Sequence, residues 1–169
     1  SVIGAAHKVP PRAAALANGT ISHAIDYDDT HFAHVGHPSV AVLPAALALA
    51  EDRDAGAEVL RDAFLVGAEA APRLGVVLGQ RHYDHGFHQT ATAGCFGASV
   101  AAGRLLDLGP QRLRMALSLA STRASGLKAQ FGTMGKPYNA GIAAANGVEA
   151  ALLAERGFDP AFGARPLKR

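Results

Sequence analysis

The sequence predicts an all-α protein, a multi-helix bundle whose helices are rich in alanine and glycine. Apolar residues recur at three- and four-residue steps through most of the chain, which is the period of an amphipathic helix. No run alternates apolar and polar residues for long enough to predict a strand. The hydrophobic 49% of the 169 residues is mostly Ala, Leu and Val, with no Trp, so we expect helices that pack closely on small side chains.

Six helical segments follow from this periodicity. The clearest spans 58–74, with Asp54 as its candidate N-cap, and another begins at Pro110, a residue suited to a first helical turn. A third spans 140–156, with Asn139 placed to cap its start and Gly157 placed to end it. Weaker patterns predict helices over 12–25, 40–52 and 89–106.

Composition narrows the classes of function. The net charge is +2 and the arginines are scattered, so no nucleic-acid-binding surface is expected. Cys95 is the single cysteine, which excludes an intramolecular disulfide, and its apolar surroundings predict a buried, inert thiol. The longest strongly apolar run, 40–50, is too short for a membrane span, and the N-terminus has no signal-peptide pattern. We therefore expect a soluble cytoplasmic protein without membrane contact.

Three loops carry the titratable side chains, at 26–39, 79–88 and 131–139. Six histidines form two series with three-residue steps, and a helical series would favour a metal site. Pro38 pushes His37 out of helical geometry, and Gly86 weakens a helix in the second series. Metal ligands, structural histidines, and acid–base or anion-binding histidines all remain open, the last being favoured. The six are His31, His34, His37, His82, His85 and His88.

Lys136 follows Gly132 and Gly135 and precedes Pro137 in the third loop, just ahead of a predicted helix. A lysine near a helix N-terminus forms a good site for a carboxylate, because the ammonium and the unpaired N–H groups attract the same anion. Combined with aspartates and histidines that can exchange protons, this set suits elimination, epimerisation or decarboxylation of small polyacids. Nothing in the sequence matches a nucleophile elbow, a phosphate-binding loop or a dinucleotide fingerprint.

Four segments in order carry a resemblance that covers nearly the whole chain. They are "NGTISHAIDYDDTH" (18–31), "HPSVAVLPAALALAE" (37–51), "GFHQTATAGCFGASVAAGRLLDL" (86–108) and "FGTMGKPYNAGIAAANGVEAALLAERGF" (131–158). The chain resembles the MmgE/PrpD family, which includes 2-methylcitrate dehydratase, cis-aconitate decarboxylase and iminodisuccinate epimerase. The resemblance implies a helical first domain, here residues 1–169, without the family's opening helices or its α+β second domain.

The resemblance also implies roles for five residues. Asp26 matches the family's active-site aspartate, and His37 and His88 match its active-site histidines, so these three are the expected catalytic residues. Thr30 and Lys136 match substrate-binding positions. Two further aspartates, Asp28 and Asp29, are expected to cap and orient the loop. The family commonly has a histidine where this chain has Asn139, so no proton-transfer role is carried over to that position.

For the intact protein, the resemblance implies a homodimer and chemistry on di- or tricarboxylates without cofactor or metal, with 2-methylcitrate dehydratase-like elimination expected first. We expect the isolated 169 residues to be inactive and to self-associate. Two alternatives stay open at this stage: a histidine-based metal-binding module, and a non-catalytic helical protein whose apolar faces bind a partner chain.

Overall fold

The computed structural model describes residues 1–157, and within them the protein is helical with no strand. The two extended pairings in this part are isolated bridges, His31 with Gly36 and Phe87 with Leu127. The predicted all-α fold is confirmed. No helix in residues 1–157 is both long enough and apolar enough to cross a membrane.

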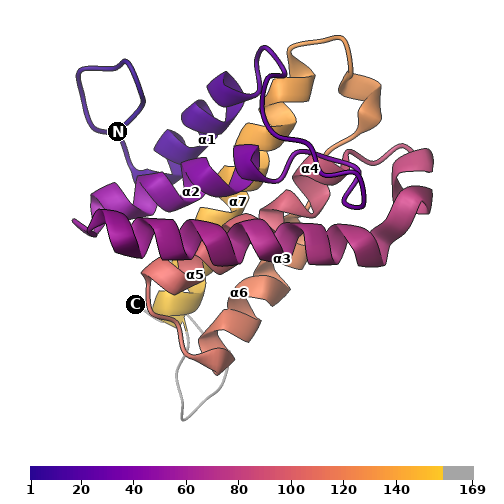
Figure 1. Ribbon diagram of the computed structural model, residues 1–169. Coiled ribbons are helices and arrows are strands. Elements are labelled where there is room, and N and C mark those ends of the chain that lie inside the picture. Colours follow the sequence, from indigo (N-terminus) through magenta and orange to yellow (C-terminus); the bar gives the residue numbers. More distant parts are fainter. Residues whose placement is uncertain (158–169) are drawn as a thin grey trace.

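Within the described residues, seven α-helices and one short 3-10 helix make up the bundle (Figure 1). In chain order they are α1 (Pro11–Ser22), α2 (Ser39–Asp52), α3 (Ala57–Asp84), α4 (Gln89–Thr92), α5 (Gly94–Leu105), α6 (Pro110–Arg123), η1 (Lys128–Gln130) and α7 (Gly135–Gly157). α7 packs against α1, α2, α5 and α6, while α3 crosses one face of the bundle and packs mainly on α5. Because α7 contacts most of the other helices, its position fixes theirs.

The core is built almost entirely from alanine, as the composition predicted. Ala14, Ala45, Ala98, Ala144 and Ala151 all lie in one fully buried cluster. Larger side chains such as Leu49 are rare among the buried residues of the described chain. Small side chains let the helix backbones pack close together. The bundle is therefore stabilised by many close contacts between backbones and small side chains, and less by large buried side chains.

Glycines mark the closest approach, between α1 and α7. A Cβ added to Gly141 would lie 2.1 Å from Thr20 Oγ1 and 2.4 Å from the carbonyl oxygen of Leu16. A Cβ on Gly19 would lie 2.9 Å from the Cα of Gly141. Neither glycine has room for a side chain, so this crossing requires glycine on both helices.

The predicted helix at 58–74 is longer than expected. α3 runs to Asp84, so the predicted loop at 79–88 is wrong for residues 80–84. Gly79 has φ 66° and ψ −179°, which kinks the chain, and the helix resumes directly after it. Asp54 does not cap α3, because Gly56 occupies the N-cap. Asp54 instead has φ 51° in the turn that ends α2, where Ala55 N donates to Ala50 O.

The start of the last helix was also predicted too late. α7 begins at Gly135, so residues 135–139 are helical and Asn139 is a buried residue inside the helix instead of its cap. Pro137 sits in the first turn, where a missing N–H costs nothing, so it is compatible with the early start. α7 ends at Gly157 as expected. Phe158 and the last residues of the expected 1–169 domain lie outside the described residues.

The remaining boundaries differ less. α1 ends at Ser22, three residues before the predicted end. The segment predicted as one helix over 89–106 divides into α4 and α5 at Ala93. α2 and α6 begin close to their predicted starts.

Cys95 is a fully buried free thiol, as the sequence predicts, and burial raises its pKa to about 12.

The helix crossing gives a first test, the substitution Gly141→Ala. An alanine inside an exposed helix normally stabilises by about 1 kcal/mol relative to glycine. Here the added methyl would overlap α1, and overpacking of this kind costs about 1–3 kcal/mol of unfolding free energy. Urea denaturation of the wild type and of Gly141→Ala measures the change in unfolding free energy.

Gly109→Ala is the matched control, because no atom lies within 4 Å of the Cβ that alanine would add there, and the φ of −62° suits any residue. Gly109 is the N-cap of α6, where alanine is less favourable than glycine, so the control should lose some unfolding free energy but less than Gly141→Ala. Equal stability of the two variants would contradict the close crossing of α1 and α7.

Candidate active site

The loop that joins α1 to α2 faces the start of α7 and the segment before α4 at one end of the bundle (Figure 1). A cavity of about 400 Å³ opens there. Four of the five predicted site residues line it: Thr30, His37, His88 and Lys136. The cavity is completed by residues that the sequence did not single out as site residues, among them Gln80 and Tyr83 from α3, Thr90 from α4 and Phe131.

Asp26, the fifth predicted residue, forms an ion pair with Lys136 through its Oδ2 and the lysine Nζ. The two residues are 110 positions apart in the sequence, so the fold brings them together. The hydrogen bond from Lys136 is the main cause that holds the pKa of Asp26 below its usual value. Asp26 has φ 59°, a conformation that aspartate adopts more readily than most residues and that turns the chain just after α1.

His37 lies between two carboxylates. Its Nδ1 is 3.1 Å from Asp28 Oδ2 and its Nε2 is 3.6 Å from Asp26 Oδ1. Its backbone N–H donates to Thr90 Oγ1 at 3.0 Å, which ties the loop to α4. The close ion pair with Asp28 is the largest cause that raises the pKa of His37 above its ordinary value, against the opposing effect of burial.

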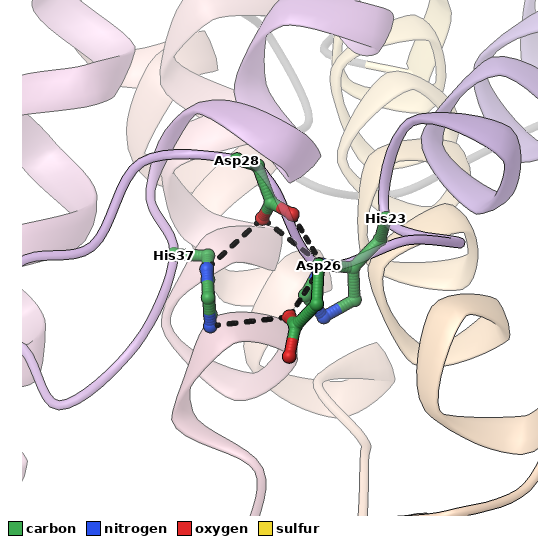
Figure 2. A group of neighbouring side chains, drawn as sticks. All are labelled: His23, Asp26, Asp28 and His37. Atoms are coloured by element: carbon green, nitrogen blue, oxygen red, sulfur yellow. Dashed lines mark hydrogen bonds and ion pairs between the residues drawn. The ribbon is translucent and has the colours of Figure 1, made fainter.

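His23 completes this group and was not predicted as a site residue. Its Nδ1 lies 2.9 Å from both carboxylate oxygens of Asp28, and the side chain is buried at the end of α1 (Figure 2). Burial opposes ionisation of Asp28, but the hydrogen bonds with His23 and the ion pair with His37 outweigh it and hold the Asp28 pKa well below its usual range. A histidine three residues before Asp26 was the available sequence signal.

The two supporting aspartates have different tasks. Asp29 accepts hydrogen bonds from the backbone N–H and the hydroxyl of Ser39, at 3.2 and 2.9 Å, and so caps the first residue of α2 as expected. Asp28 does not cap a helix. It connects His23 to His37 and thereby orients both rings.

His88 is a buried residue in the wall of the cavity. The rings of Phe131 and His88 pack edge to face, with their centroids 4.9 Å apart. The rings of His23 and His88 are stacked, with their centroids 5.9 Å apart. Burial, followed by the nearby charges of His23 and Lys136, lowers the pKa of His88 to about 3. His88 is therefore uncharged at neutral pH, whereas the pKa of His37 is shifted in the opposite direction, upward.

The other histidines of the two series diverge. His31 lines the cavity, and His34 is fully buried against Gly75, with burial lowering its pKa to about 4. His82 lies on α3 and contacts Thr92 Oγ1 at 2.9 Å. The three-residue spacing therefore does not place either series on one helical face.

Four side chains of the site also have donor atoms that could hold a metal ion. His23, Asp26, Asp28 and His37 each offer one ligand atom, and these atoms lie within 4.8 Å of one another. Two imidazoles and two carboxylates suit a divalent ion such as Zn²⁺. The ammonium of Lys136 lies beside Asp26, and its positive charge repels a divalent cation bound at the same position.

The site predicts a specific dependence of stability on pH. A raised folded-state pKa means that the contribution of His37 is complete below its unfolded value of 6.5 and is lost as pH rises through the folded-state value. The unfolding free energy lost in Asp28→Asn should therefore be larger at about pH 6 than at about pH 8.5. Urea denaturation at both pH values measures this.

Asp29→Asn is the control, because Asp29 binds Ser39 and its loss should cost the same at both pH values. The lowered pKa of Asp28 acts in the opposite direction, but only in acid, as pH falls through a value far below this range. A pH-independent cost of Asp28→Asn would contradict the pairing with His37.

Comparison with known proteins agrees with this architecture. The MmgE/PrpD N-terminal domain matches residues 1–162. Cis-aconitate decarboxylase of Aspergillus terreus is 37% identical over 166 residues, which are 94% of this chain and 34% of that protein. The human cis-aconitate decarboxylase is 38% identical over 157 residues, 89% of this chain and 32% of that protein. The chain thus spans about a third of the length of these relatives. It belongs to the MmgE/PrpD family.

Proposed function

We propose that the full protein carrying this chain is a lyase acting on a small tricarboxylate, with cis-aconitate as its first candidate substrate. The observation that carries the proposal is the Asp26–Lys136 ion pair beside a cavity lined by His37 and His88. Two relatives are cis-aconitate decarboxylases, which favours decarboxylation over the dehydration of 2-methylcitrate that the resemblance first suggested. The homodimer and the cofactor-free chemistry are part of the same proposal.

Lys136 is the carboxylate-binding group in this proposal. Its side chain is about one-fifth exposed and lines the cavity, and its ammonium is already paired with a carboxylate of the protein. A substrate carboxylate would compete with Asp26 for it. Once Lys136 turns to the substrate, Asp26 loses the partner that lowers its pKa and becomes better able to take part in proton transfer.

His37 is the proposed proton donor. Decarboxylation of cis-aconitate breaks the C–C bond to one carboxylate, releases CO₂ and shifts the electron pair through the double bond. The carbon at its far end then takes up one proton. A group that supplies this proton must be protonated near neutral pH, and Asp28 favours that state of His37. Asp26, 3.6 Å from His37 Nε2, lies where it can exchange a proton with it.

A second candidate is a divalent-cation site, favoured by the donor set of His23, Asp26, Asp28 and His37. The two candidates differ in their response to a chelator. In the polyacid lyase, turnover and folding are unaffected by EDTA, whereas a metal module loses stability when the ion is removed.

The proposed activity is tested in the full protein with cis-aconitate and 2-methylcitrate, each with and without EDTA. Release of CO₂ from cis-aconitate in the presence of EDTA is the expected result. Dehydration of 2-methylcitrate instead would keep the lyase and correct the reaction. Absence of both turnover and binding would favour the non-catalytic interaction protein.

Substitution of Lys136 tests the binding group. Lys136→Ala should weaken binding of cis-aconitate by about 1.5–3 kcal/mol, the range for a hydrogen bond to a charged group, as measured by calorimetry. Lys128→Ala is the control. That lysine lies over the ring of Tyr83, 3.6 Å from its centroid, and its loss should leave affinity nearly unchanged. Equal losses in both variants would contradict the assignment.

Asp26→Asn should separate binding from turnover. The substitution removes the carboxylate that competes for Lys136, so cis-aconitate should bind at least as tightly as in the wild type. Turnover should fall by about 100-fold or more if Asp26 takes part in proton transfer. Weaker binding with unchanged turnover would reverse the assigned roles. Circular dichroism confirms that the variant is folded.

A further inference from the structure

Asn139 is a buried side chain on α7, one helical turn after Lys136, and it faces His88. Its Nδ2 lies 3.2 Å from His88 Nδ1 and 3.3 Å from the carbonyl oxygen of Leu127. The sequence predicts a helix cap at this residue. Its position inside α7 gives it a different task, because one of its contacts is His88, which lines the cavity.

The carbonyl of Leu127 determines whether the NH₂ or the oxygen of the Asn139 amide faces Leu127 and His88. A backbone carbonyl can only accept a hydrogen bond, so the amide group beside it must be the NH₂. The opposite orientation would set the amide oxygen against the carbonyl oxygen. The NH₂ therefore also faces His88 Nδ1, and that ring nitrogen must be the acceptor.

A neutral imidazole that accepts at Nδ1 carries its proton on Nε2. The surroundings favour the neutral ring as well, because His88 is 2% exposed and lies near Lys136, His23 and His37. Asp26 is the negative group that opposes this effect. The hydrogen bond to Asn139 sets the tautomer, while burial among these groups keeps the charge at zero.

We propose that Asn139 is a positioning residue that fixes His88 as the Nε2–H tautomer, so that His88 presents a hydrogen-bond donor to a carboxylate or enolate oxygen in the cavity. His88 then holds its proton instead of transferring it, and proton transfer falls to His37 and Asp26. The nature of the oxygen ligand rests on the proposed function. The tautomer itself does not.

The tautomer is read by ¹⁵N NMR of the full protein labelled at histidine, with the His88 signals identified by their loss in His88→Gln. The expected result between about pH 6 and 8 is an unprotonated Nδ1 and a protonated Nε2. A protonated Nδ1 in the wild type would overturn the proposal. This measurement needs neither substrate nor turnover, so it stands apart from any failure of the proposed function.

Asn139→Asp places an acceptor where the wild type has a donor. His88 Nδ1 should then become protonated, as the Nδ1–H tautomer or as the imidazolium, and the KM for cis-aconitate and the pH profile of turnover should change together. Asn146→Asp is the control, because this second buried asparagine of α7 contacts Arg123 and should leave the His88 signals unchanged. An unprotonated Nδ1 in Asn139→Asp would also overturn the proposal.

Discussion

The close crossing of α1 and α7 is the constraint on which the site depends. Gly19 and Gly141 face each other at a distance that excludes any side chain. His23 lies one turn after Gly19, and Lys136 lies just over one turn before Gly141. The crossing therefore places the end of α1 beside the start of α7. The ion pair between Asp26 and Lys136 follows from helix packing, and the loop between α1 and α2 has only a short distance to cover.

Charges in the site are arranged so that neighbouring groups differ in protonation. Asp28 stays ionised because two imidazoles bind it, and it in turn favours the protonated form of His37. His88, in the wall of the cavity, is neutral because it is buried and an amide faces its Nδ1. Two histidines that look equivalent in the sequence thus have opposite pKa shifts. Their environments make His37 the better proton donor and keep His88 as a neutral ring that can donate a hydrogen bond.

Periodicity was enough to predict the helical bundle, because the alanine-rich faces repeat at the helical period and no run alternates. It could not predict that α3 resumes after Gly79, because glycine breaks a helical pattern and its φ of 66° does interrupt the helix at that residue. Five site residues were predicted through the family resemblance, and the structure brings all five to one end of the bundle. His23 and Asn139 were missed because their roles depend on contacts with Asp28 and His88 that local sequence does not encode.

The ion pair also explains how a ligand could change the site that binds it. Asp26 and Lys136 neutralise each other before any anion arrives, which lowers the cost of keeping both charges in a partly buried site. In the proposed function, a polyacid would replace one carboxylate with another, so the ammonium would keep a partner while Asp26 is released beside His37, 3.6 Å away. Binding is then coupled to a rise in the basicity of Asp26. The same exchange favours ligands with several carboxylates, because a second carboxylate can accept from His88 while the first holds Lys136.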